Sequence, residues 1–261
     1  MIRAKKSLGQ NFLIDKNVID RIINTVLITD NEILEVGPGT GNLTREILRK
    51  NASKIYLVEK DAFLAESLKE VIDERVIIFN EDILKFDENS LSKNKIIVFG
   101  NLPYNISTEI LSKWITNLKH DYWFSNLILM FQKEVADRII AQFNTSAYGR
   151  LSILANWRLN INKICDISPE SFSPRPKIQS TLIHFTPKEK FAEIKDPINL
   201  EKITRIFFSH RRKMLKKPFN QIFNGNIDLL NKLNLDLNLR PQNLDFDTYY
   251  QLTIEYEKLR S

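Results

Sequence analysis

The sequence predicts an α/β fold in which a mostly parallel β-sheet carries helices on both faces and is followed by a small all-helical domain. Short apolar runs alternate with amphipathic segments up to about residue 188, which is typical of successive β-α units. Glycines and polar residues follow several of these runs directly, as they do at the ligand-binding edge of open α/β sheets. Beyond residue 188 the apolar spacing is helical to the end.

Each expected strand is a short apolar run that ends near a glycine or a polar residue. The runs are residues 33–36, 55–59, 76–79, 96–99 and 127–131, with a closing strand at 180–185. Helical spacing predicts helices at about residues 17–28, 43–48 and 62–71, and another that starts near Leu151. Pro187-Lys188-Glu189-Lys190 is typical of a linker, so we expect one domain over residues 1–188 and a second over 189–261.

Composition limits the cellular setting. A single cysteine, Cys165, excludes an internal disulfide and fits a reducing compartment. The N-terminus has no apolar run typical of a signal peptide, and no stretch approaches the ~20 apolar residues that span a bilayer. We therefore expect a cytosolic protein. A net charge of +6 and a pI near 9.2 favour a polyanionic partner, which would be nucleic acid or an anionic membrane surface. The alternative is that these charges only keep the surface solvated.

A glycine turn, Gly37-x-Gly39-x-Gly41, follows the first expected strand and precedes a helix. Glycines let the backbone approach a ligand closely and permit positive φ. Such a turn can serve NAD, FAD or S-adenosylmethionine, or can be a tight structural turn. Its spacing differs from the GxGxxG that places a pyrophosphate on a helix N-terminus, and Pro38 removes one backbone donor. A ligand without phosphates is therefore the better fit.

Two acidic residues follow the next two strands. Glu59 ends the second strand, about 20 residues after the glycine turn, where a carboxylate can accept hydrogen bonds from both hydroxyls of a ribose. Asp82 ends the third strand and can accept a hydrogen bond from an adenine amine, although alone it could be a solvated loop acid. Together with the glycine turn, the two acids predict a crevice that binds an adenosine moiety.

The tetrapeptide Asn101-Leu102-Pro103-Tyr104 follows the fourth strand. An exocyclic amine on an aromatic base is a poor nucleophile because its lone pair is delocalised into the ring. Hydrogen-bond acceptors favour a pyramidal nitrogen, and the Asn101 side-chain oxygen and a backbone carbonyl held by Pro103 can supply two. Tyr104 can stack on the base. Taken alone, Asn-x-Pro could also be an ordinary β-turn.

These motifs resemble those of the KsgA/RsmA family of small-subunit ribosomal RNA adenine N6,N6-dimethyltransferases, and the resemblance extends over nearly the whole chain. The matching segments are Lys6–Leu13, Glu35–Gly41, Gly100–Ser107, Gln132–Ala136, Tyr148–Ser152 and Phe172–Lys177. The resemblance implies a Rossmann-like class I methyltransferase fold that uses S-adenosylmethionine as methyl donor. It also implies that residues 1–188 form the donor-binding catalytic domain with an N-terminal lid, and that residues 189–261 bind RNA on the ribosome.

The resemblance also implies roles for individual residues. Asn11 and Leu13 would enclose the donor from the lid, and Phe172 would stack on the face of the target adenine opposite Tyr104. The remaining donor contacts would be Gly37, Gly39, Glu59, Asp82 and Asn101. The implied targets are two adjacent adenosines in the 3′-terminal hairpin loop of 16S rRNA in the small ribosomal subunit, each receiving two methyl groups, with a role in subunit biogenesis.

A basic segment lies in the helical C-terminal part. Its cationic residues are Arg211, Arg212, Lys213, Lys216 and Lys217. Nearby apolar side chains are spaced to pack inward, which leaves these charges outward. The functional interpretation is contact with RNA phosphates, and the alternative is a solvated helix face. The three histidines are far apart in sequence, so we expect no structural or catalytic metal.

Three other functions compete with this interpretation. A relative that methylates a large-subunit (23S) rRNA adenine and confers antibiotic resistance would share residues 101–104, but residues 148–152 and 172–177 favour the small-subunit enzyme. A non-catalytic ribosome assembly factor of the same fold is disfavoured by the intact Asn101–Tyr104 and Glu59. An NAD-dependent oxidoreductase would bind nicotinamide. No heptad or exposed apolar repeat suggests an obligate oligomer, so we expect a monomer.

Overall fold

The computed structural model describes residues 5, 9–71, 73–118 and 121–260. Residues 6–8, at the start of the first family segment, and His120 lie outside this part. The chain forms two compact units, Met1–Ala136 with Asn160–Pro187, and Asp137–Leu159 with Lys188–Ser261. The expected division at residue 188 lies where the first unit ends, at Pro187, but Asp137–Leu159 groups with the C-terminal helices. The reason is packing, because α6 (Arg150–Arg158) lies against α7 (Pro197–Ser209) and α10 (Phe246–Lys258).

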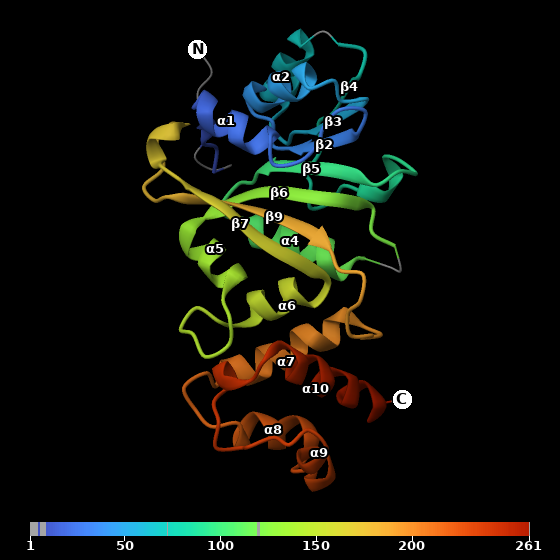
Figure 1. The fold of residues 1–261 in the computed structure, drawn as a ribbon, viewed down its shortest axis with the longest axis vertical. Helices are drawn as coiled ribbons and strands as arrows, with labels where there is room; N and C mark the ends of the chain where they lie inside the picture. Colours follow the sequence, from blue (N-terminus) through green and yellow to red (C-terminus); the bar gives the residue numbers. More distant parts are fainter. Residues whose placement is uncertain (1–4, 6–8, 72, 119–120, 261) are drawn as a thin grey trace. The chain divides into compact units, whose positions relative to one another are not determined.

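In the described part of the first unit, a seven-stranded sheet has the order β4-β3-β2-β5-β6-β9-β7 (Figure 1). Its strands are β2 (Glu32–Val36), β3 (Lys54–Val58), β4 (Val76–Phe79), β5 (Ile96–Asn101), β6 (Phe124–Gln132), β7 (Leu159–Ile167) and β9 (Ser180–Pro187). The strands from β4 to β6 pair in parallel, and β9 is antiparallel to β6. The mostly parallel sheet predicted from the apolar runs is thus confirmed. The strand β7 was not predicted.

The N-terminal segment contributes a short strand of its own. Its β1 (Phe12–Leu13) pairs antiparallel with β8 (Phe172–Ser173), which comes from the distant FSPRPK segment. The register joins Leu13 to Phe172 and Phe12 to Ser173. This pairing places the N-terminal segment beside the carboxyl edge of the sheet, where the glycine turn and the Asn101–Tyr104 tetrapeptide also lie.

Helices of the first unit connect these strands. They are α1 (Lys16–Ile23), α2 (Asn42–Arg49), α3 (Ala62–Ser67), α4 (Ser107–Thr116) and α5 (Lys133–Ile140), the last of which continues into the second unit. The side chain of Asp15 caps α1 by accepting two backbone N–H bonds. That helix ends at Ile23, earlier than the expected residue 28, with Asn24 as its C-cap. The helix predicted at 62–71 is α3 followed by a 3₁₀ turn, Leu68–Glu70.

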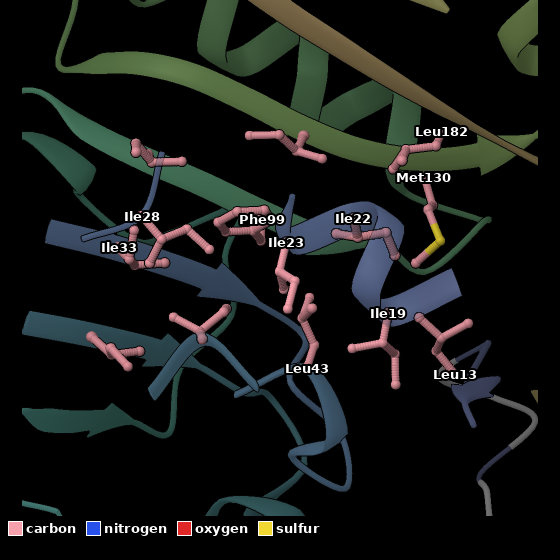
Figure 2. Packing of buried hydrophobic residues seen from close by; sticks show 14 of the residues in the cluster. Leu13, Ile19, Ile22, Ile23, Ile28, Ile33, Leu43, Phe99, Met130 and Leu182 are labelled. Carbon is pink, nitrogen blue, oxygen red and sulfur yellow. The ribbon is translucent and has the colours of Figure 1, made fainter. Parts of the chain in front are cut away.

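The core of the first unit lies between the sheet and helices α1 and α2. Adjacent residues of β2, such as Ile33 and Leu34, are both fully buried, so the sheet is covered on both faces. Figure 2 shows Ile19, Ile22 and Ile23 of α1 among the sheet residues of this core. Complete burial of such side chains contributes about 1.5–3 kcal/mol each. The packing fixes the strand ends, and therefore the loops that follow them.

The second unit is helical, as the sequence predicts. Besides α6, α7 and α10 it contains α8 (Lys216–Phe223) and α9 (Ile227–Lys232). The hydroxyl of Tyr250 on α10 donates to the carbonyl of Ile153 on α6 at 2.9 Å, which ties residues 137–159 to the C-terminal helices. Among the helices of the described residues, none combines the length and apolarity that a bilayer crossing requires.

Candidate active site

One cavity of the first unit collects residues from the carboxyl ends of four parallel strands. Gly37 follows β2, Glu59 follows β3, Asp82 lies beyond β4 and Asn101 ends β5. The cavity is also lined by the remaining predicted residues of this edge and of the N-terminal segment, namely Asn11, Leu13, Gly39, Leu102, Pro103 and Tyr104. A parallel sheet brings such residues together because its strands all end at the same edge.

The glycine turn has the backbone conformation that glycine allows. Gly37, Gly39 and Gly41 have φ of +67°, +57° and +75°, a region that residues with a Cβ rarely adopt. At Gly39 a Cβ would also lie 2.8 Å from the ring of Phe12. The turn therefore packs directly under the N-terminal segment, and a side chain at Gly39 would push that segment away from the cavity.

Glu59 is held at the cavity by backbone donors. The residue is 6% exposed, and its carboxylate accepts the N–H of Gly39 at 3.2 Å and the N–H of Asp61 at 2.8 Å. Burial raises the pKa of Glu59, and these two hydrogen bonds act in the opposite direction. Each carboxylate oxygen accepts one of these bonds and keeps further lone-pair capacity for a ligand hydroxyl.

Glu35, which precedes the glycine turn, also lines the cavity. It is 2% exposed, and its carboxyl accepts a hydrogen bond of 2.6 Å from the Thr44 hydroxyl. Burial raises the pKa of Glu35 to about 7, with a further contribution from the charge of Glu59. The sequence analysis gave this residue no role, although an acid inside an apolar strand is an available signal.

The raised pKa of Glu35 predicts a pH dependence of stability. The folded protein binds this proton more tightly than the unfolded chain does. The contribution of protonated Glu35 to the free energy of unfolding is therefore fully present below the ordinary pKa of 4.5 and is lost as pH rises to about 7. Glu35→Gln removes the titration and keeps an acceptor for Thr44. We expect the melting temperature of the variant to exceed that of the wild type at pH 8, and the difference to shrink toward pH 5. A difference in calorimetric melting temperature between the variant and the wild type that stays constant from pH 5 to pH 8 would contradict the expectation.

Asp82 is an ionised acceptor at the cavity wall. Its carboxylate accepts from the Lys60 ammonium at 2.8 Å and from the backbone N–H of Leu84 at 3.1 Å. The hydrogen bond from Lys60 lowers the pKa of Asp82. Lys60 was not predicted as part of the site, although its position next to Glu59 on the strand-end loop is a usable signal. The ion pair with Lys60 restricts the orientation of the Asp82 carboxylate, a restriction that a freely solvated loop acid would not have.

The N-terminal segment is fastened over the cavity by two asparagine amides. Nδ2 of Asn101 donates to the carbonyl of Asn11, and Nδ2 of Asn42 donates to the carbonyl of Leu13, both at 2.8 Å. Asp61 adds a third attachment, because it accepts from the Gln10 amide at 3.1 Å and from the Lys5 ammonium at 2.9 Å. The bond made by its amide nitrogen leaves the side-chain oxygen of Asn101 free to accept a hydrogen bond from a ligand. Asn42 and Asp61 were not predicted from the sequence.

The two aromatic residues predicted to stack on the target are placed differently. Tyr104 is half-buried and lines the cavity, with its hydroxyl 2.5 Å from Oγ of Ser180. Phe172 is 3% exposed and packs in the core that contains Leu13 and Met130. It is not among the residues that line the cavity, because the pairing of β8 with β1 turns its side chain inward beside Leu13.

The predicted RNA-binding residues belong to the second unit. Four of them, Arg212, Lys213, Lys216 and Lys217, line one surface hollow together with His210, Met214, Asn220, Asn238 and Arg240. Arg211 is directed elsewhere, since its guanidinium donates to the carbonyl of Ser146 and lies 6.0 Å from the ring of Phe208. The arginine and lysine side chains of this hollow face no acidic residue among the described residues that line it. Arg240 also lines the hollow, and the sequence analysis did not predict it.

The class of protein follows from this geometry. A Rossmann-like sheet whose GxGxG turn, buried acid after the second parallel strand and Asn-Leu-Pro-Tyr loop line one cavity is typical of a class I methyltransferase. The profile of the family described as ribosomal RNA adenine dimethylase matches residues 1–258. The chain therefore belongs to the ribosomal RNA adenine dimethylase family, which confirms the predicted family and fold.

Similar proteins agree with this assignment. The chain is 62% identical to "Ribosomal RNA small subunit methyltransferase A" of Pelagibacter ubique (strain HTCC1062) over 99% of both chains. It is 40% identical to the protein of the same name from Wolbachia sp. subsp. Drosophila simulans (strain wRi), over 99% of this chain and 96% of that one. A crystal structure of a dimethyladenosine transferase from Plasmodium falciparum has a TM-score of 0.81 at 27% identity, covering 95% of this chain and 98% of that one. The 23S rRNA methyltransferase ErmE shares the fold, with a TM-score of 0.70 at 20% identity, covering 95% of this chain and 100% of that one.

Proposed function

We propose that this protein transfers methyl groups from S-adenosylmethionine to N6 of two adjacent adenosines in the 3′-terminal hairpin loop of 16S rRNA, two to each base. One observation carries the proposal. The Asn101–Tyr104 loop, with its acceptors for an amine, lines the same cavity as Glu59 and Asp82, which suit an adenosine-containing donor. The small-subunit names of the curated relatives favour 16S rRNA over the 23S alternative. Ribosomal subunits as substrate also fit the expected cytosolic location.

The donor site is proposed from the charges and backbone groups that line the cavity. Glu59, held by Gly39 and Asp61, would accept hydrogen bonds from the ribose hydroxyls. Asp82 would accept from the adenine amine while Lys60 keeps it ionised. Gly37 and Gly39 allow the backbone to approach the ligand, and Asn11 and Leu13 would cover it. No metal is needed, because a sulfonium is already an activated methyl donor.

The transfer step is proposed to depend on alignment of the amine. The side-chain oxygen of Asn101 and a backbone carbonyl of the Leu102-Pro103 turn would accept the amine hydrogens and favour a pyramidal nitrogen. Its lone pair then forms the new N–C bond as the C–S bond breaks, S-adenosylhomocysteine leaves, and one proton passes from nitrogen to water. Holding nitrogen, carbon and sulfur in line is the main catalytic contribution.

The target base is proposed to leave its stack and enter the cavity. Tyr104 would then stack on one face of the adenine, a contact worth about 1–3 kcal/mol in comparable sites. We keep Phe172 as the candidate for the opposite face. Because its ring is buried beside Leu13, this role requires the ring to become accessible when RNA binds, so a fluorescence or crosslinking signal at position 172 should appear only in the RNA complex.

The cationic hollow of the second unit is proposed to bind phosphates of the ribosomal RNA. Replacing Arg212 and Lys213 with alanine should weaken binding to small subunits and lower the slope of log affinity against log salt by up to about 2. Lys93 and Lys95, exposed at the opposite end of β5 from the cavity, provide a control that removes the same number of charges. Equal salt slopes for the two double variants would mean that the hollow is only solvated.

Methyl transfer to isolated ribosomal subunits tests the proposed function. Radiolabelled S-adenosylmethionine is offered to unmethylated small subunits, with large-subunit RNA as the control. We expect label in N6,N6-dimethyladenine of 16S rRNA. Label in large-subunit RNA alone would indicate the 23S specificity. Absence of label in both, with binding to small subunits retained, would indicate a non-catalytic assembly factor. Sedimentation of the active protein checks the expected monomer.

A further inference from the structure

The hydroxyl of Tyr104 is bound to a residue far away in the sequence. It lies 2.5 Å from Oγ of Ser180, the first residue of β9. Ser180 is fully buried, whereas the Tyr104 side chain is half-buried and lines the cavity. The hydrogen bond therefore joins the cavity-lining aromatic ring to the interior of the sheet.

Ser180 is a rigid attachment point. It pairs with Gln132 in the antiparallel ladder between β6 and β9. On one side of it, the carbonyl of Gln179 accepts the N–H of Lys133 at 2.9 Å. On the other side, Thr181 pairs with Phe131 in the same ladder. A shift of the Ser180 hydroxyl would require movement of a paired strand, so its position is set by the sheet and not by the loop.

Tyr104 lies in the turn between β5 and α4, where its carbonyl accepts a hydrogen bond of 3.3 Å from the Ser107 hydroxyl. This bond holds the backbone and leaves the side chain to be oriented by other contacts. A tyrosine side chain has two rotatable bonds, and a fixed hydroxyl removes most of the freedom of the ring. With the hydroxyl engaged by Ser180, the ring is the part of Tyr104 that a base in the cavity would meet. Burial raises the pKa of the Tyr104 phenol, which agrees with a neutral, hydrogen-bonded group and not with an acid or base in the reaction.

We propose that Ser180 is a positioning residue for methyl transfer, because its hydroxyl fixes the angle at which the Tyr104 ring meets the target adenine. This inference rests on the proposed function. A base that is stacked on a fixed ring has its N6 amine held near the Asn101 acceptor, whereas a base on a rotating ring samples many orientations that do not react. Ser180 itself touches neither donor nor base.

The test is a double-mutant cycle on the rate of methyl transfer. Ser180→Ala, Tyr104→Phe and the double variant are compared with wild type in single turnovers, with enzyme and donor both in saturating excess over unmethylated small subunits. We expect each single variant to slow transfer by about threefold to tenfold, as the loss of one hydrogen bond implies. The double variant should be no slower than either single one. Donor affinity measured by calorimetry should stay within about twofold of wild type in all three.

Thr181→Val is the matched control, since it removes a neighbouring buried hydroxyl whose partner, Asp166, is not in the site. We expect its transfer rate to equal that of wild type. A loss as large as that of Ser180→Ala would mean general damage to β9 and would overturn the inference. Multiplying effects in the double variant, or a wild-type rate in Ser180→Ala, would overturn it as well.

Two further results distinguish a failure of the proposed function from a failure of the role of Ser180 alone. Wild-type protein that transfers no methyl group to adenine N6 would refute the proposed function, and the positioning role with it. Active wild type with unaffected variants refutes only the role of Ser180. If Ser180→Ala does not fold, Tyr104→Phe breaks the same bond from the other side and leaves the sheet intact, so a wild-type rate in that variant refutes the role on its own.

Discussion

Replacing Asn101 with alanine is expected to lower the turnover of methyl transfer by about 100-fold or more, the usual cost of losing one preorganised group that acts on the reacting atoms. The physical reason is that the variant loses the side-chain oxygen proposed to accept from the target amine. Donor affinity should fall far less, because Glu59 and Asp82 remain. Turnover is measured with saturating small subunits, and donor affinity by calorimetry.

Asn42 provides the control for this experiment. Its amide fastens the N-terminal segment through the carbonyl of Leu13 at the same 2.8 Å as the Asn101 amide fastens it through Asn11. Asn42→Ala therefore loosens the segment without removing the proposed acceptor. If both variants lose turnover equally, the effect of Asn101 comes from holding the segment. Near-normal turnover in Asn101→Ala would rule out its role toward the amine altogether.

Replacing Glu59 with alanine is expected to weaken donor binding by about 10- to 100-fold. The estimate follows from the loss of charge-assisted hydrogen bonds to the ribose, each worth about 1.5–3 kcal/mol, partly offset by water that enters the space. The backbone N–H groups of Gly39 and Asp61 also lose their acceptor, which loosens the glycine turn. Turnover at saturating donor should change less than affinity does.

Glu32→Gln is the matched control for the Glu59 variant. Glu32 is also a hydrogen-bonded carboxylate on this sheet, bound to Tyr56, Ser92 and Asn94, but it begins β2 instead of following β3. Its replacement should change stability and leave the dissociation constant of the donor as it is. Calorimetric affinity that is unchanged in Glu59→Ala would remove Glu59 from the donor site.

The sheet and the strand-end residues of the cavity, Gly37, Glu59, Asp82 and Asn101, could be predicted because both depend on local patterns. An apolar run such as 76–79 is a strand on its own evidence, and Glu59 or Asn101 can be placed at the edge by counting from the strand end. The strand β7 was missed because its alternation of apolar and polar residues breaks in the middle, where Lys163 stands at an apolar position and Ile164 at a polar one.

The contacts missed from the sequence are mostly long-range. Asn42 meets Leu13 and Ser180 meets Tyr104 through tertiary packing, and nothing in the local sequence of either partner indicates the other. The inward orientation of Phe172 depends in the same way on pairing between β1 and β8. The grouping of residues 137–159 with the C-terminal helices also arises from helix packing, which a linker-based boundary near residue 188 does not detect.

The bond between the Asn101 amide and the Asn11 carbonyl has a consequence for the order of events in the catalytic cycle. Every methyl group transferred requires spent donor to leave and fresh donor to enter. If residues 11–13 move aside for that exchange, the Asn101 amide loses its acceptor, and the side chain that we propose to hold the target amine loses its fixed orientation. Reactivity and donor exchange would then be mutually exclusive states, and the rate at which this short segment opens and recloses would set an upper limit on the successive methylations that we propose.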